Sequence, residues 1–75
     1  MNKQRRKQIE KATALMQEAL EILETVKDEE QEAFDNIPEG LQGSEKGELM
    51  EEIIGYLEDT YSDLENAIDN LGNIE

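Results

Sequence analysis

Apolar residues recur every three or four positions along two long stretches of this 75-residue chain. In the first stretch they stand at Ile9, Ala12, Met16, Ala19, Leu23, Val26, Ala33 and Ile37. In the second they stand at Met50, Ile53, Leu57, Leu64, Ala67, Leu71 and Ile74. One polar residue interrupts each series, Glu30 in the first and Thr60 in the second. Alternating steps of three and four are the heptad pattern of helices that pack side by side. The chain is therefore predicted to be all-α, with one helix over about residues 3–36 and another over about 44–71.

Further large apolar residues widen each stripe. They are Leu15, Leu20, Ile22 and Phe34 in the first stretch, and Ile54, Tyr61 and Ile68 in the second. A single coiled-coil partner needs only a narrow stripe, whereas a wider one indicates contact with more than one helix.

The segment between the two stretches contains the only proline and three of the five glycines. Pro38 lacks an N–H and disfavours helical geometry at the residue before it, so the first helix is expected to end near residue 36. Gly40 and Gly43 permit positive φ, and Ser44 suits the N-cap of the second helix. A hinge over residues 37–43 would fold the single domain, residues 1–75, into an antiparallel αα-hairpin.

Association with another copy or with a partner protein is the expected way in which this chain covers its apolar stripes. A domain of this size is marginally stable, and without cysteine or histidine it lacks disulfides and the common zinc sites. Two hairpins that pair into a four-helix bundle, or a larger homo-oligomer, would bury both stripes; a foreign helical partner is the main alternative. The residues expected at the self-association contact are Ile9, Met16, Leu23, Val26, Met50, Ile53, Leu57, Tyr61, Leu64 and Ile68.

Charge is strongly segregated. Residues 1–11 hold five basic side chains and one acid, whereas the whole chain has a formal net charge of −13. The acidic body is therefore not expected to bind nucleic acid or an anionic membrane, because phosphate contacts need lysine and arginine. Two interpretations of the basic start stay open: pairing with acids at the end of the second helix, or an arm that binds nucleic acid or a partner. The residues are Arg5, Arg6, Lys7 and Lys11, with Asp63, Glu65, Asp69 and Glu75 as counter-charges.

Carboxylates also repeat at heptad spacing on the second helix, at Glu51, Glu52, Glu58, Asp59 and Glu65. Such repeats lie roughly 10 Å apart on one face of a helix. They either keep a small acidic protein soluble, or imitate the phosphates of a nucleic acid and occupy the basic groove of a DNA- or RNA-binding enzyme.

The sequence predicts no enzyme, no cofactor and no metal site. Nucleophilic catalysis by cysteine or histidine is excluded by composition, and Glu30 is the only acid on the apolar stripes, where it suits a polar register-setting layer. Residues 63–74 lack the glycine and final glutamate of an EF-hand loop. Glu48 and Glu52 could hold magnesium in an oligomer, although a solvated face explains them more simply.

The basic start is not followed by the apolar run of a signal peptide, and no stretch suits a membrane span. A cytoplasmic location is therefore expected.

Three large apolar residues, Phe34, Ile37 and Leu41, surround the hinge, where a simple turn needs none. They either cap the end of the bundle or form an exposed tip that binds a partner.

The central segment from Asp28 to Glu45 resembles that of a group of short acidic proteins from phages and prophages of Gram-positive bacteria. The opening Arg5-Arg6-Lys7 and the ending Leu64-Glu65-Asn66-Ala67-Ile68-Asp69-Asn70-Leu71 also resemble this group. The resemblance implies a phage-encoded protein that binds host machinery, including defence enzymes, in the cytoplasm of the bacterial host. The expected function is a non-enzymatic protein–protein interaction module, with nucleic-acid mimicry as the alternative.

Overall fold

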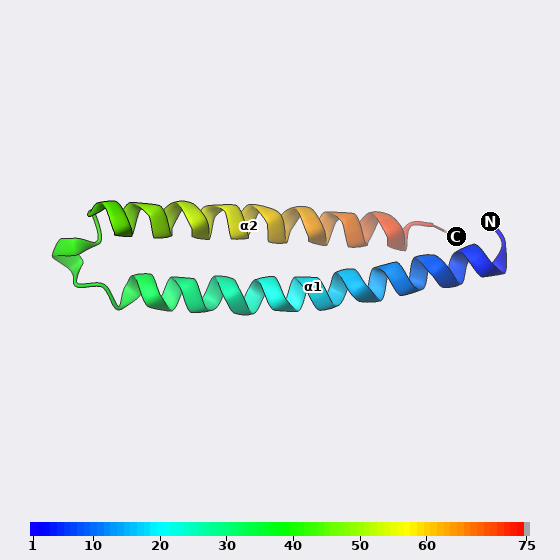
Figure 1. Ribbon diagram of the computed structural model, residues 1–75. Coiled ribbons are helices and arrows are strands. Elements are labelled where there is room, and N and C mark those ends of the chain that lie inside the picture. The colour runs from blue at the N-terminus through cyan, green and yellow to red at the C-terminus, as the bar shows by residue number, and fades with distance from the viewer. Residues whose placement is uncertain (75) are drawn as a thin grey trace.

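The structure is a computed structural model that describes residues 1–74. Two antiparallel helices, α1 (Lys3–Asp35) and α2 (Glu45–Gly72), are joined by a hinge that contains the 3-10 turn η1 (Glu39–Leu41) (Figure 1). The hairpin is a rod that measures 58 × 15 × 13 Å. The predicted all-α class and the two-helix hairpin are thereby confirmed.

The start of α1 depends on a cap, because its first turn contains no acid to complement the helix dipole. The Asn2 side chain supplies that cap: its Oδ1 accepts a hydrogen bond from the backbone N–H of Arg5 at 2.8 Å. At the other end, Asn36 closes the helix in front of Pro38, whose ring cannot continue it.

The hinge turns without any left-handed residue. Gly40 and Gly43 permit positive φ, but no residue in the described part of the chain adopts it. Instead, Pro38 opens the short 3-10 turn, in which Leu41 N–H donates to the Pro38 carbonyl at 2.7 Å and Gln42 N–H to the Glu39 carbonyl at 3.3 Å. A 3-10 turn needs only ordinary negative φ, so the glycines are not required by backbone conformation.

The start of α2 follows the sequence prediction, since Ser44 Oγ accepts a hydrogen bond from the Gly47 backbone N–H at 3.4 Å. Gly47 is buried because the hinge folds back over the first turn of α2. A Cβ atom at this position would lie 2.7 Å from the carbonyl carbon of Gln42 and closer still to its oxygen. Glycine is therefore required at position 47 for space.

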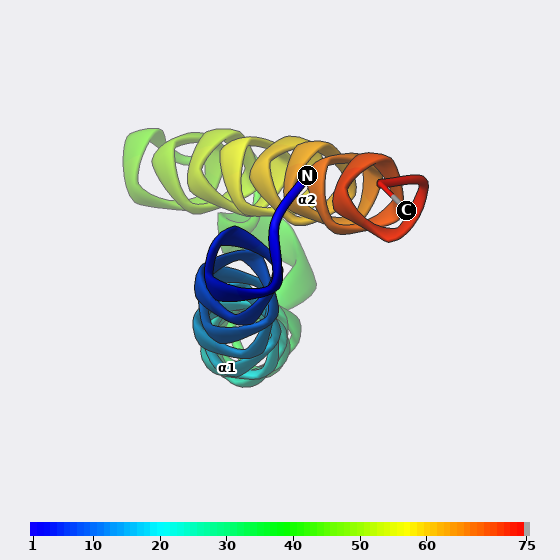
Figure 2. The ribbon, with the colours of Figure 1, turned by 90° about the vertical axis from the view of Figure 1, so that its right-hand side faces the viewer.

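The two helices contact each other through one heptad stripe on each, here called the inner seam. Its members are half-buried or buried: Ile9, Thr13, Met16, Leu20, Leu23, Lys27, Glu30 and Phe34 on α1, and Gly47, Met50, Ile54, Leu57, Tyr61, Leu64, Ile68 and Leu71 on α2. Figure 2 looks along the hairpin and shows that the two helix axes are inclined to each other, as in helices that wrap around a shared seam.

The inner seam corrects the stripe drawn from the sequence. On α1, Ala12, Val26 and Ala33 are exposed, and the residue after each of them is half-buried instead. Ala19 and Ala67 stay half-buried, but beside the larger Leu20 and Ile68. The same happens on α2, where Ile54 replaces Ile53. The physical reason is area: Leu20, Phe34, Tyr61 and Ile68 remove more apolar surface from water than the alanines and threonine of the alternative stripe.

The hairpin buries little. Ile54, at 7% exposure, is the only large apolar side chain of the described residues that counts as buried. The chain exposes 5828 Å². A globular monomer of 8.6 kDa is expected to expose about 4,700 Å². About 1,100 Å² of additional surface therefore remains open to solvent.

Candidate interaction surfaces

The exposed large apolar side chains follow a second heptad stripe on each helix. Leu15, Ile22 and Val26 on α1 are 56%, 63% and 42% exposed, and Leu49, Ile53 and Tyr56 on α2 are 55%, 39% and 64% exposed. We call these six residues the outer apolar face. Apart from the terminal Met1 and Ile74 and the hinge residue Leu41, they account for every exposed large hydrophobic side chain of the described residues.

Both halves of the outer apolar face lie on the same side of the hairpin. On each helix its stripe runs one position before the members of the inner seam, for example at Val26 before Lys27 and at Ile53 before Ile54. One position corresponds to about 100° of helix rotation, and equal offsets on two antiparallel helices point to the same side of the pair. The residues of α1 lie around the middle of that helix and those of α2 lie nearer the hinge, so the face crosses the hairpin diagonally.

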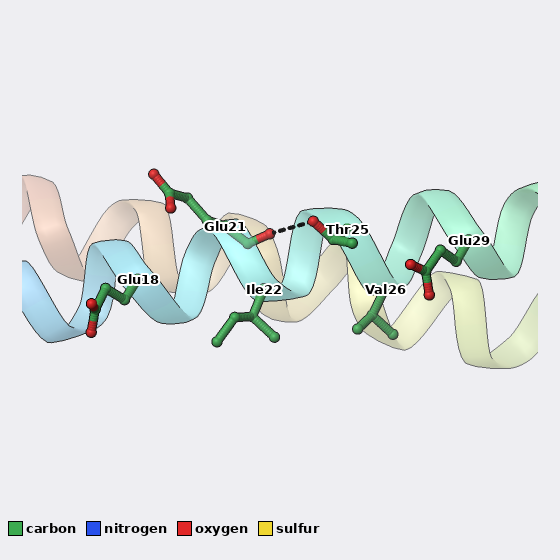
Figure 3. A pocket seen from close by; sticks show the side chains of 6 residues that line it. All are labelled: Glu18, Glu21, Ile22, Thr25, Val26 and Glu29. Atoms are coloured by element: carbon green, nitrogen blue, oxygen red, sulfur yellow. Dashed lines mark hydrogen bonds between the residues drawn. The ribbon is translucent and has the colours of Figure 1, made fainter.

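An open depression borders this face on α1. It has a volume of about 580 Å³ and is lined by Glu18, Glu21, Ile22, Thr25, Val26 and Glu29. Figure 3 shows Ile22 and Val26 pointing to the same side of α1, with the carboxylates of Glu18 and Glu29 beside them and α2 behind. Thr25 Oγ1 donates to the Glu21 carbonyl at 3.1 Å, so its hydroxyl is bonded within the helix. The depression is therefore apolar in its middle and acidic at its margin.

The opposite side of the hairpin is acidic. Five carboxylates each directly follow an inner-seam residue in the sequence: Glu51, Glu58 and Glu65 on α2, and Glu24 and Asp28 on α1. Partial burial, together with the carboxylates of Glu24, Glu65 and Asp28, raises the pKa of Tyr61 above its usual value. We call these five carboxylates the acidic face. Tyr61 marks where its two halves meet.

One cation lies on the inner seam next to this face. Lys27 Nζ lies 5.1 Å from the centroid of the Tyr61 ring, a distance at which a cation and an aromatic face attract each other. The half-buried Glu30 stands one turn further along α1. The sequence singled out Glu30 as a polar layer, and its position on the inner seam fits a polar break in an otherwise apolar contact.

The residues predicted for self-association divide between the two stripes. Eight of them belong to the inner seam and contact the other helix of the same chain: Ile9, Met16, Leu23, Met50, Leu57, Tyr61, Leu64 and Ile68. Val26 and Ile53 lie on the outer apolar face. Leu49 and Tyr56 were not predicted from the sequence, and Leu15 and Ile22 were predicted only to widen the stripe. Their heptad spacing was the available signal.

The predicted partner-binding residues are also separated by the structure. Phe34 and Ile37 are half-buried, which favours their role as a cap on the end of the hairpin, whereas Leu41 is 57% exposed at the tip. The carboxylates Glu51, Glu52, Glu58, Asp59 and Glu65 are all exposed. Glu51, Glu58 and Glu65 belong to the acidic face, while Glu52 and Asp59 lie on the back of α2.

The basic segment lies beside the end of α2 (Figure 1). Arg6 lines a small depression together with Ile9, Leu71 and Ile74. The expected pairing of Arg5, Arg6, Lys7 and Lys11 with Asp63, Glu65 and Asp69 stays a prediction, and Glu75 lies outside the described residues.

Within residues 1–74, no three side chains of the metal-ligating types come together closely enough to hold an ion. Neither α1 nor α2 has an uncharged apolar run long enough to span a bilayer. Comparisons with protein-family models, curated proteins and solved structures give no match to this chain.

Proposed function

We propose that this chain is a non-enzymatic protein-interaction module that binds protein through its outer apolar face. The observation that carries the proposal is the register of the exposed large apolar residues, which gather on one side of the hairpin instead of scattering over it. Isolated exposed hydrophobic side chains are ordinary on a protein surface, whereas a continuous apolar patch rimmed by charge indicates a contact site.

The acidic margin of the outer apolar face determines which chemical groups a partner must present. Glu18 and Glu29 flank Ile22 and Val26, so a partner would offer apolar side chains at the centre and polar or basic groups at the rim. The proposal extends to the cytoplasm of a bacterial host, as the resemblance to phage proteins implies, where the module would modulate or inhibit a host protein, including a defence enzyme.

The test is affinity capture with the wild-type chain as bait in a lysate of the bacterial host. The Ile22→Glu variant places a charge in the middle of the outer apolar face and should lose the captured protein. Gln17→Glu is the matched control, because it adds the same charge at an exposed position on the other side of α1 and should capture as the wild type does. Equal capture by both variants would contradict a contact through the outer apolar face.

A second function is favoured by the acidic face. Its carboxylates repeat at heptad spacing on α2 and continue across Tyr61 onto α1, which forms a band of negative charge on one side of a rod. Such a band could occupy the basic groove of a DNA- or RNA-binding enzyme.

Mimicry predicts competition with nucleic acid. Binding to the enzyme should be displaced by DNA and should weaken steeply as salt is raised from low to physiological concentration. The double variant Glu51→Gln with Glu58→Gln should weaken binding more than Glu52→Gln with Asp59→Asn, which removes as much charge from the neighbouring face. Binding that tolerates salt and DNA would refute mimicry.

A further inference from the structure

The outer apolar face has the properties of a contact between two copies of this chain. Resting on the proposed function, we propose that a second copy is the protein that covers it, and that the two hairpins pack face to face with their hinges at opposite ends. The result is a four-helix bundle with a two-fold axis that passes near residue 24 of α1, close to the middle of the rod.

The exposed area matches what such a dimer needs. The chain leaves about 1,100 Å² more surface open than a globular monomer of its mass. A stable interface buries about 800 Å² from each partner. Covering the outer apolar face with a second copy would therefore bring the protein close to the surface expected of a compact fold.

The apolar residues match each other in this arrangement. Around a two-fold axis near residue 24, Ile22 of one copy lies opposite Val26 of the other, and Leu15 lies opposite Ala33. On α2 the same axis brings Leu49 opposite Ile74 and Tyr56 opposite Ala67. Ile53 lies opposite Asn70, and the other large side chains meet each other or alanine, as in a helical core that interdigitates.

The alternative dimer, with both hinges at the same end, matches poorly. It would pack α1 of one copy against α2 of the other at the same level along the rod. Ile22 and Val26 would then lie against Thr60 and Asp63, and Leu15 would lie against Asn70. Burying apolar groups against polar groups that lose water is unfavourable.

Charge also selects the arrangement with opposite hinges. The basic end, residues 1–11, carries +4, whereas the hinge end, residues 35–48, holds four acids and one lysine and carries −3. Opposite hinges place each basic end beside the acidic end of the other copy. Hinges at the same end would place the two basic ends together, and like charges at that distance repel.

The remaining side of the hairpin cannot replace the outer apolar face in this role. Pairing through the acidic face would bring Glu51, Glu58 and Glu65 of both copies together without basic groups between them. In the proposed dimer the two acidic faces point away from each other, one on each side of the bundle, and remain free for another partner.

The first measurement is the mass of the wild-type chain in solution by sedimentation equilibrium at micromolar concentration. A dimer is expected. Ile22→Glu should raise the dissociation constant of the dimer at least about 100-fold, because both copies carry the substitution and each would bury one charge in the interface. Gln17→Glu should leave it unchanged. Both positions are exposed in the single hairpin, and the helical circular dichroism of each variant reports whether the hairpin still forms.

The second measurement is the orientation. The chain has no native cysteine, so Leu41→Cys introduces a single site for a spin label at the exposed tip of the hinge. With opposite hinges the two labels of a dimer lie roughly 50 Å apart, from the helical rise between the axis and the tip. With hinges at one end they lie roughly 20 Å apart or less.

The outcomes test three points separately: the arrangement of the dimer, the second copy as the occupant, and the proposed function. A dimer with the long label distance supports the inference, and a dimer with the short distance overturns the arrangement. A monomer, a higher oligomer or a dimer that survives Ile22→Glu overturns the second copy as the occupant. If such a monomer still captures a host protein in an Ile22-dependent way, the proposed function stands without this inference; if it captures none, both fail.

Discussion

Replacing Gly47 by alanine is the most informative single change, because its effect on stability opposes what helix propensity predicts. Gly47 lies in the first turn of α2, where alanine is favoured over glycine by about 1 kcal/mol. The structure, however, leaves no room for a methyl group at this position. The added Cβ would lie 2.7 Å from the carbonyl carbon of Gln42, which is backbone and cannot rotate away.

The size of the effect follows from these two contributions. Overpacking costs about 1–3 kcal/mol, and a contact with rigid backbone belongs at the upper end of that range. After subtraction of the propensity gain, the Gly47→Ala variant should be less stable by about 2 kcal/mol. For a domain of this size that corresponds to a midpoint lower by roughly 10 °C. The hydrogen bond from Gln42 Nε2 to the Ile37 carbonyl, 3.2 Å long, would be disturbed as well.

Gly55→Ala is the matched control. Gly55 is also inside α2, and a Cβ there would meet no atom within 4 Å. The same substitution should therefore raise stability by about 1 kcal/mol. Thermal unfolding followed by circular dichroism, at one protein concentration for all variants, measures both effects. Equal stabilisation by the two substitutions would refute the packed hinge, since it would show that Gln42 does not lie over Gly47.

Four further predictions follow from the same contacts. Ser44→Ala should destabilise the hairpin by about 1 kcal/mol in urea unfolding, because the Gly47 N–H loses its cap; an unchanged midpoint would count against it. Phe34→Ser should lower the melting temperature far more than Leu41→Ser, because Phe34 is half-buried on the inner seam and Leu41 is exposed; the reverse order would contradict the assignment of cap and tip. The raised pKa of Tyr61 means that its stabilising contribution is complete below the pKa of an unfolded tyrosine and is lost as pH rises through the folded value. In a Tyr56→Phe variant, tyrosinate absorbance should therefore appear at higher pH in the folded chain than in denaturant, and coincident titrations would disprove the shift. Glu29→Leu should tighten the dimer, because Glu29 continues the stripe of Ile22 and Val26; sedimentation that shows weaker association would contradict the position of that stripe.

Much of this protein could be predicted from local sequence. The heptad spacing predicted two long helices, Pro38 predicted where the first one ends, and Ser44 predicted where the second one begins. These features depend on residues within one or two turns of each other, so they can be recognised before the chain is folded. The cap at Asn2 and the tight packing of Gly47 were not predicted, although the former lies at the expected start of α1.

The choice between the two apolar stripes was decided only by the tertiary structure. Ile9, Met16 and Leu23 belong to both possible stripes on α1, as Met50, Leu57 and Leu64 do on α2, so periodicity alone cannot say which neighbours join them. The antiparallel partner decides, because a helix pair can bury only one narrow stripe and the stripe with Leu20, Phe34, Ile54 and Tyr61 removes more apolar area from water. The large apolar residues outside the buried stripe then form the outer apolar face. The sequence determined that this chain carries more apolar stripe than one hairpin can cover; the fold determined which part stays exposed and on which side.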